Sequence, residues 1–306
     1  MDESLILDRS KYAPLIQQMI ANSVGARVVT DKNVYQEGSP VNKPLLKQIV
    51  SDVLLPGSGI LGLEHLLELH QIALRKKACL ILMEHYSNFD IPNLYELLER
   101  QGEKGQEIAN AIVSVAGVKL NETSPLVLAF TEVFTRVVIY PGRSVESIDD
   151  HGKRQEAERR RARINIAGLK ALNTLRREGR LILVFPSGTR YKPWDPSTGR
   201  GLKEIDTYLK FYSHMVTVSI NGNNLLANPN GNMDEDFIYK DLVLFTVSPV
   251  VKCSEFRREA LRDSADEEEG TKQRVVDGLM AALARQHAQT EEKRRAMLAA
   301  LGISPP

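Results

Sequence analysis

Two polar residues five positions apart, His85 and Asp90, could form an acid–base pair. His85 closely follows the apolar run 78–83, so we expect it at the carboxyl end of a strand, where α/β sheets usually bind ligands. Imidazole has a free pKa of about 6.5 and can accept a proton from an attacking hydroxyl, and a carboxylate on its other nitrogen stabilises the imidazolium. Asp90 would equally suit the N-cap of a following helix, a structural role, so the spacing alone leaves both interpretations open.

A second motif, Phe-Pro-Ser-Gly-Thr-Arg-Tyr-Lys-Pro at 185–193, follows another apolar run at 181–184. Its Pro and Gly predict a turn whose backbone N–H groups can face an anion. Arg190 and Lys192 add two cations, of which Arg can hold a phosphate through two parallel hydrogen bonds and Lys acts as a point charge. The alternative is a solvated turn with ordinary surface charges.

The two motifs together resemble the glycerol-phosphate acyltransferase family, which includes glycerol-3-phosphate and lysophosphatidic acid acyltransferases. The chain has His-x4-Asp and, about a hundred residues later, Phe-Pro-Ser-Gly-Thr-Arg. The string 186–193, followed by Asp-Pro-Ser-Thr-Gly at 195–199, is most similar to the soluble plastid-type glycerol-3-phosphate acyltransferases. The resemblance covers residues 75–225 and, more loosely, the N-terminal helices.

This resemblance implies roles for individual residues. The base of the family falls on His85 and its carboxylate on Asp90, while its phosphate-binding cations fall on Arg190 and Lys192. A further cation falls on Arg143, in a stretch that matches the family less well.

Three residues of the second motif, Ser187, Gly188 and Thr189, are expected to line the site. Most of the broader family has Glu where this chain has Ser187, and the plastid-type branch resembles this chain there. Phe-Pro-Ser-Gly is not the Gly-x-Ser-x-Gly elbow of hydrolases. We therefore do not expect Ser187 to be a nucleophile.

The resemblance implies that a fatty acyl group passes from an acyl carrier protein or coenzyme A thioester to the sn-1 hydroxyl of glycerol 3-phosphate, giving lysophosphatidic acid. It implies no metal and no bound cofactor. Two alternatives stay open: a lysophosphatidic acid acyltransferase, and a non-catalytic module that binds anionic lipid or a carrier protein. A hydrolase using the same His–Asp pair is disfavoured because no serine stands in an elbow.

A basic cluster precedes the second motif and is interrupted by two acids. It is either a docking surface for an acidic carrier protein or anionic lipid head groups, or simply a solvated helix face. Its members are Lys153, Arg154, Arg159, Arg160, Arg161 and Arg163.

Composition limits the partners and the cellular location that the chain can be expected to have. The 40 Lys and Arg nearly balance the 39 Asp and Glu, so we expect no nucleic-acid partner. No run approaches the roughly 18–20 apolar residues of a membrane helix, so we expect no transmembrane segment. The two cysteines have no metal-ligand spacing. A cytoplasmic or plastid-stroma-like soluble compartment, with peripheral membrane contact as an option, is the expected location.

The order of apolar segments predicts an α/β fold: a mixed sheet flanked by helices, with a small helical N-terminal domain. We place that domain at residues 1–76 and an α/β acyltransferase domain at 77–306. Strands are expected in the runs 78–83, 111–116, 136–140, 180–185, 215–220 and 243–250. Helices are expected at 12–22, 42–55, 61–75, 91–101, 153–177, 203–212 and 266–301.

Overall fold

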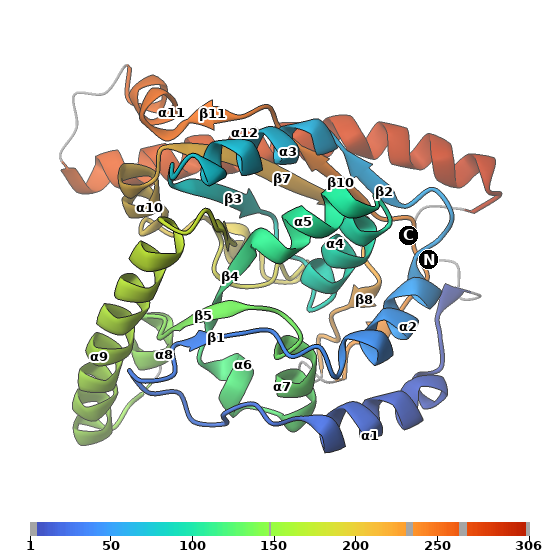
Figure 1. Ribbon diagram of the computed structural model, residues 1–306, viewed down its shortest axis with the longest axis horizontal. Helices are drawn as coiled ribbons and strands as arrows, with labels where there is room; N and C mark the ends of the chain where they lie inside the picture. The colour runs from blue at the N-terminus through green and yellow to red at the C-terminus, as the bar shows by residue number, and fades with distance from the viewer. Residues whose placement is uncertain (1–4, 147, 231–234, 263–267, 304–306) are drawn as a thin grey trace.

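A mixed β-sheet forms the centre of the protein (Figure 1). The computed structural model describes residues 5–146, 148–230, 235–262 and 268–303. Within these residues the sheet has nine strands in the order β1-β5-β4-β6-β3-β7-β10-β2, with β11 paired to one end of β7. The strands are β1 (Tyr35–Gln36), β2 (Gly59–Leu61), β3 (Cys79–Met83), β4 (Ile112–Gly117), β5 (Arg136–Ile139), β6 (Leu181–Val184), β7 (His214–Asn221), β10 (Leu244–Val247) and β11 (Val251–Lys252), and a separate pair is formed by β8 (Leu225–Leu226) and β9 (Phe237–Ile238).

Helices flank this sheet, and the predicted α/β fold is confirmed. Each apolar run expected as a strand overlaps one, and each segment expected as a helix overlaps one, with boundaries that differ by a few residues. Of the expected helix 266–301, positions 266 and 267 lie outside the described residues. The helices are α1 (Ala13–Asn22), α2 (Lys43–Val53), α3 (Leu63–Leu74), α4 (Asp90–Glu99), α5 (Glu103–Ala111), α6 (Lys119–Glu122), α7 (Pro125–Thr131), α8 (Arg143–Glu146), α9 (His151–Leu175), α10 (Ile205–Phe211), α11 (Cys253–Ala260) and α12 (Glu268–Ala300).

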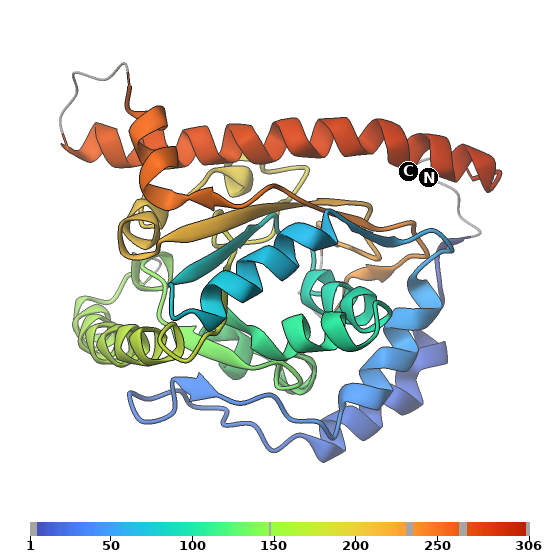
Figure 2. The same ribbon diagram turned by 45° about the horizontal axis from the view of Figure 1, so that its top comes forward.

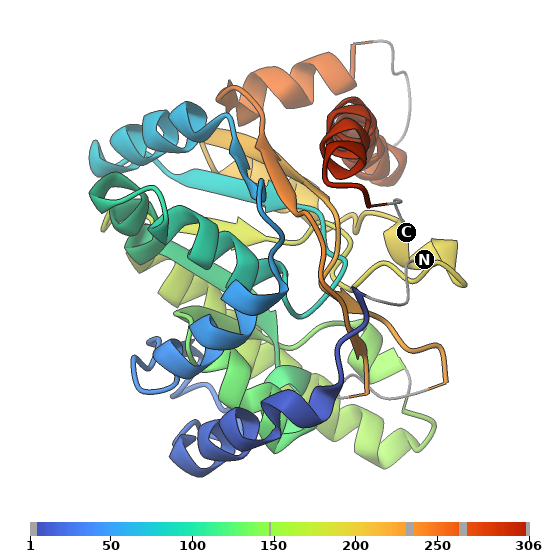
Figure 3. The same ribbon diagram turned by 90° about the vertical axis from the view of Figure 1, so that its right-hand side faces the viewer.

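The alternation of side chains along β3 explains why helices cover both faces of the sheet. Cys79, Ile81 and Met83 belong to the core shared with α2, α3, α4 and α5. Leu80 and Leu82 belong to the core shared with α9, α10 and α12. Successive side chains of a strand point to opposite faces, so a wholly apolar strand needs cover on both sides. Figure 3 shows α12 end-on at one face of the sheet and α3 to α5 at the other.

The first 76 residues contribute to the sheet as well as to the helices. β1 pairs with β5 and β2 pairs with β10, two strands that the sequence analysis does not foresee. Leu46 and Val50 of α2 lie in the same core as Leu94 of α4. The predicted boundary at residue 76 falls between α3 and β3, and the segment before it is packed into the same sheet and core as the rest.

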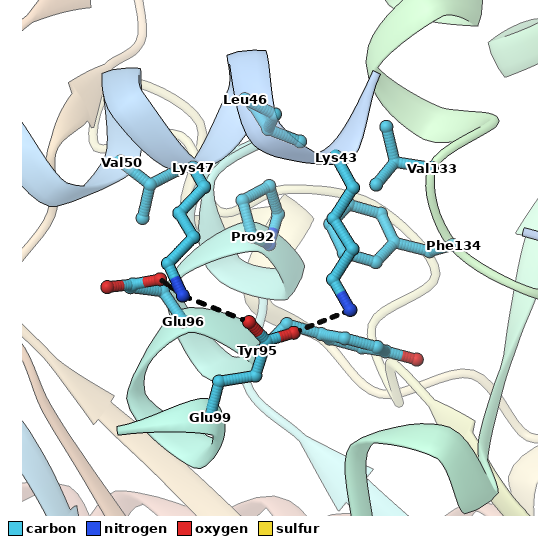
Figure 4. Close-up of a pocket in the computed structure, with 10 residues that line it drawn as sticks. All are labelled: Lys43, Leu46, Lys47, Val50, Pro92, Tyr95, Glu96, Glu99, Val133 and Phe134. Atoms are coloured by element: carbon cyan, nitrogen blue, oxygen red, sulfur yellow. Dashed lines mark hydrogen bonds and ion pairs between the residues drawn. The ribbon is translucent and has the colours of Figure 1, made fainter. Parts of the chain in front are cut away.

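Ion pairs reinforce the contact between α2 and α4 (Figure 4). Lys43 Nζ lies 2.7 Å from Glu99 Oε1, and Lys47 Nζ lies 3.4 Å from Glu96 Oε2 and 3.2 Å from Glu99 Oε2. The cavity beside them has a volume of about 20 Å³. That is room for about one water molecule, so this contact is a packing interface and not a ligand site.

The C-terminal helix α12 spans the molecule and closes one side of it (Figure 2). Its first half packs through apolar side chains such as Val276 and Leu279. Its second half docks through polar contacts: Gln286 accepts from Thr217 Oγ1 at 2.8 Å, and Arg294 pairs with Asp241 at 2.5 Å. Gln286 and Arg294 each bond more than one group, and satisfied polar networks of this kind specify one arrangement of a helix on the sheet.

Candidate active site

Two turns meet at the carboxyl edge of the sheet, one after β3 and one after β6. The two strands are parallel neighbours, with Leu82 opposite Val184, so the turns emerge side by side. The backbone N–H of Tyr191 donates to the carbonyl oxygen of His85 at 2.8 Å. The rings of His85 and Phe185 stack, with centroids 3.9 Å apart and planes 14° from parallel. The structure therefore brings the His-x4-Asp motif and the cation-bearing motif into direct contact.

His85 and Asp90 form the expected pair. His85 Nδ1 lies 2.8 Å from Asp90 Oδ2. The carboxylate also accepts the N–H of Tyr86 at 2.7 Å, and the N–H and Oγ–H of Ser87 at 3.0 Å. Asp90 is 3% exposed, so these donors replace water around a buried charge. The carboxylate fixes the ring and leaves Nε2 as the nitrogen available for chemistry.

The N-cap interpretation of Asp90 does not fit the geometry. Helix α4 begins at Asp90, its N-cap is Phe89, and no side chain caps it. The carboxylate instead turns back to the N–H groups of Tyr86 and Ser87, which precede the helix. Its position in the first turn still places a negative charge at the positive end of the helix dipole.

A cavity of about 410 Å³ opens beside the pair. The side chain of His85 is 17% exposed, and its Nε2 makes no hydrogen bond with any residue that the structure describes. The volume lies within the range of about 300–1,000 Å³ usual for small-molecule sites. Most of the walls are apolar or aromatic; the lining residues are Glu84, His85, Tyr86, Pro186, Ser187, Tyr191, Gly199, Met280, Ala281 and Ala284.

The turn after β6 depends on its glycine and serine. Gly188 has φ +63°, and a Cβ there would lie 2.4 Å from Leu202 Cδ1, so only glycine fits without strain. Ser187 is buried, and its Oγ donates to the carbonyl of Thr189 at 2.7 Å. Ser187 borders the cavity, Gly188 and Thr189 are not among its lining residues, and the Ser187 hydroxyl stabilises the turn. Thr189 is half-buried.

The two cations of this turn differ in their surroundings. Arg190 forms an ion pair through Nη1 with the buried Asp236, and only 11% of its side chain is exposed. Lys192 is half-buried, and its backbone N–H donates to Thr198 Oγ1 at 2.9 Å. Asp236 lies 46 positions further along the chain, and no motif in the sequence indicates that it pairs with Arg190.

Arg143 lies further along the same edge. It begins α8 just after β5, is exposed, and β4 and β6 separate its strand from β3. Three strand spacings amount to about 14 Å. The structure therefore places Arg143 at the correct edge, but not beside His85.

The basic cluster lies on α9, which packs against β5. Arg160 is not available for docking, because it binds Glu122 and the carbonyl of Val29 and stacks over Tyr140. Arg161 is half-buried near Gly142. The remaining four members are exposed: Lys153, Arg154, Arg159 and Arg163.

A second imidazole–carboxylate pair, absent from the sequence predictions, borders the site. His287 on α12 lies with Nδ1 2.9 Å from Glu84 Oε2. Burial alone would lower the pKa of His287, but the hydrogen bond and charge of Glu84 raise it above its ordinary value. The two residues are 203 positions apart, and no local spacing signals a pair at that distance.

The described residues do not support thiol chemistry, metal binding or a membrane-spanning helix. Cys79 and Cys253 are buried, and burial raises the pKa of each thiol to about 12, so neither supplies a thiolate. No group of three or more His, Cys, Asp and Glu side chains in the described part of the chain could hold a metal ion. None of the described helices combines the length and apolar character needed to cross a bilayer.

In comparisons with known proteins, no protein-family model matches the chain and no curated protein matches it. A function must therefore be inferred from the residues of the site and their geometry.

Proposed function

We propose that the protein transfers a fatty acyl group from an acyl carrier protein or coenzyme A thioester to the sn-1 hydroxyl of glycerol 3-phosphate, forming lysophosphatidic acid. One observation carries the proposal: the His85–Asp90 pair and the turn bearing Arg190 and Lys192 are in direct contact, through the Tyr191 N–H to His85 carbonyl bond of 2.8 Å. A phosphate held by the second turn would present its alcohol to the first. Both substrates are water-soluble, which fits reaction in the cytoplasm or a stroma-like compartment.

The reaction requires one base and no covalent acyl-enzyme intermediate. His85 Nε2 takes the proton of the sn-1 hydroxyl as the oxygen attacks the thioester carbonyl carbon. Asp90 stabilises the imidazolium that forms, through its 2.8 Å contact with Nδ1. The tetrahedral intermediate then collapses, the C–S bond breaks, and the departing thiolate takes the proton from His85. The products are the ester and the free thiol.

Charge distribution favours one orientation of the acceptor. Glu84 lines the cavity on the side of β3 and repels a phosphate there. Arg190 and Lys192 flank Tyr191, which lines the cavity from the turn after β6. Asp236 occupies one nitrogen of Arg190, and a guanidinium has five N–H donors, so donors remain for phosphate. The phosphate therefore belongs against the second turn, with the carbon chain directed toward His85.

Among the described residues no serine or cysteine beside the His85–Asp90 pair is activated as a nucleophile, which supports direct transfer. Ser187 Oγ donates to Thr189 in its own turn, and both thiols are buried with a raised pKa. A double-displacement route needs a nucleophile within reach of a base. Direct attack by the acceptor alcohol needs only the His85–Asp90 pair.

A crossed acyl-transfer assay tests this proposal. Glycerol 3-phosphate and its 1-acyl derivative are each offered with an acyl carrier protein thioester and with acyl-coenzyme A. We expect product with glycerol 3-phosphate and little with the 1-acyl acceptor. Product only with the 1-acyl acceptor would instead indicate a lysophosphatidic acid acyltransferase. Release of free fatty acid without transfer would indicate a hydrolase, and no product with any combination would contradict an acyltransferase.

A further inference from the structure

Two imidazole–carboxylate pairs lie at this site, and the proposed reaction uses only one. The second, His287 with Glu84, joins the last helix to the end of β3. Glu84 Oε2 also accepts the N–H of Ile220 on β7 at 2.8 Å. One carboxylate thus links three elements: β3, β7 and α12.

His287 contacts both residues that flank the proposed base. Its Nδ1 lies 2.9 Å from Glu84 Oε2 and 3.4 Å from the hydroxyl of Tyr86. The rings of Tyr86 and His287 lie 5.8 Å apart. On the other side of the turn, the N–H of Tyr86 is held by Asp90. The backbone that carries His85 is therefore fixed from two directions, by Asp90 within the motif and by His287 from α12.

The same helix forms part of the cavity wall. Met280, Ala281 and Ala284 line the cavity, together with Glu84 and Tyr86. His287 follows Ala284 by three residues, so both lie on one face of α12. A contact that fixes His287 also fixes where this wall stands relative to His85.

We infer that His287 is a positioning residue that acts through Glu84 and Tyr86 to hold the His85 turn against α12. The expected effect of His287 on the reaction rate rests on the proposed function. The expected effect of His287 on the order of the turn rests on the geometry alone. The charged or titratable groups around His287 are Glu84, which directly follows β3, Tyr86 from the turn, and Glu291 and Arg294 from α12 itself.

The strength of the His287–Glu84 contact should depend on pH. Glu84 raises the pKa of His287 in the folded protein. The ion pair is therefore fully formed when the pH is below the ordinary pKa of histidine, and it is lost as the pH rises through the raised pKa of the folded state. Above it a neutral hydrogen bond remains, which is about half as strong as a charge-assisted one. Rising pH should therefore loosen the turn without releasing it.

Two variants and a matched control test the inference. His287→Ala removes the contact, while His287→Gln keeps a donor for Glu84 without charge; His151→Gln makes the same change at an exposed histidine at the start of α9. Small errors in placement near reacting atoms cost up to about 100-fold. We expect kcat about 10–100-fold lower in His287→Ala with the KM for glycerol 3-phosphate unchanged. The loss of kcat should be smaller in His287→Gln, and its kcat should fall less steeply than that of the wild type as pH rises. His151→Gln should match the wild type in both respects.

Hydrogen exchange supplies a readout that does not need acyl transfer. The amides of residues 84–90 should exchange faster in His287→Ala than in the wild type or His151→Gln, with circular dichroism confirming that each variant is folded. Unchanged exchange there would overturn the inference whatever the activity. Wild-type kcat and pH profile in His287→Ala would overturn it equally. If the wild type transfers no acyl group but exchange is accelerated, the positioning role stands and the proposed reaction fails.

Discussion

The two turns of the site end neighbouring strands, yet they are built for different tasks. The turn after β3 surrounds the Asp90 carboxylate with N–H and O–H donors and leaves His85 Nε2 facing a cavity. The turn after β6 depends on the left-handed backbone conformation of Gly188, and its Arg190 forms an ion pair with the buried Asp236. A pre-ordered acid–base pair acts on the chemical step, and a set of cations acts on binding. Changes in the first turn should therefore appear in kcat, and changes in the second in KM.

The largest effect should follow from His85→Ala. The variant removes the base while keeping the second turn, so the acceptor still binds. General base catalysis contributes about 10²–10⁴-fold, and we expect a loss of that size in kcat with little change in the KM for glycerol 3-phosphate. Steady-state kinetics on both thioester donors provide the check. Near-normal turnover would remove His85 from the mechanism.

Asp90→Asn should have the next largest effect. Asparagine keeps the shape, but its NH₂ group cannot accept from His85 Nδ1, so the ring is held in the wrong tautomer. We expect kcat to fall about 100-fold or more. Urea denaturation should also show lower stability, by about 1–3 kcal/mol, because a neutral oxygen replaces a carboxylate among buried donors. An unchanged rate with lowered stability would mean that Asp90 supports the turn alone.

Arg190→Ala should change binding more than chemistry. A hydrogen bond to a charged group contributes about 1.5–3 kcal/mol, so the KM for glycerol 3-phosphate should rise at least about tenfold while kcat changes less than in His85→Ala. The variant also leaves Asp236 unpaired, at a cost of about 3–5 kcal/mol in stability. Arg190→Lys keeps a charge near Asp236 and serves as the control. An unchanged KM in both would exclude the phosphate contact.

The smallest effect should come from α9. Arg159 and Arg163 lie four residues apart on its exposed side, and reversing both charges should raise the KM for an acidic carrier-protein donor a few-fold. The KM for acyl-coenzyme A should not change, and added salt should reduce the difference. Arg160→Ala is the internal contrast, because this residue binds Glu122 and its loss should affect stability alone, by about 1 kcal/mol. If the KM for the carrier-protein donor also stays at its wild-type value, the cluster is only a solvated helix face.

Local patterns in the sequence were sufficient to predict much of this structure. Apolar runs identify β3 and β6 because a strand buried on both faces must be apolar throughout. The residues that follow those runs, His85 and the turn with Arg190, then fall at one edge once the strands are parallel. The five-residue spacing allows the His85–Asp90 contact but leaves the N-cap role of Asp90 equally open, and the fold of the turn decides between them.

Contacts between distant segments could not be predicted in this way. The two-residue strand β1 and the three-residue strand β2 are too short to show a pattern. Asp236 lies 46 positions from Arg190, and His287 lies 203 positions from Glu84. Nothing in the neighbourhood of either residue marks its partner, because such pairs depend on how the whole chain folds. The role of α12 as a wall of the site emerges only from the structure.

A crystal structure with bound glycerol 3-phosphate tests the central claim most directly, since that claim is the convergence of both turns on one molecule. We predict the phosphate within hydrogen-bond distance of Arg190 and Lys192, and the sn-1 oxygen about 3 Å from His85 Nε2. A phosphate bound elsewhere, or an alcohol directed away from the imidazole, would contradict the account.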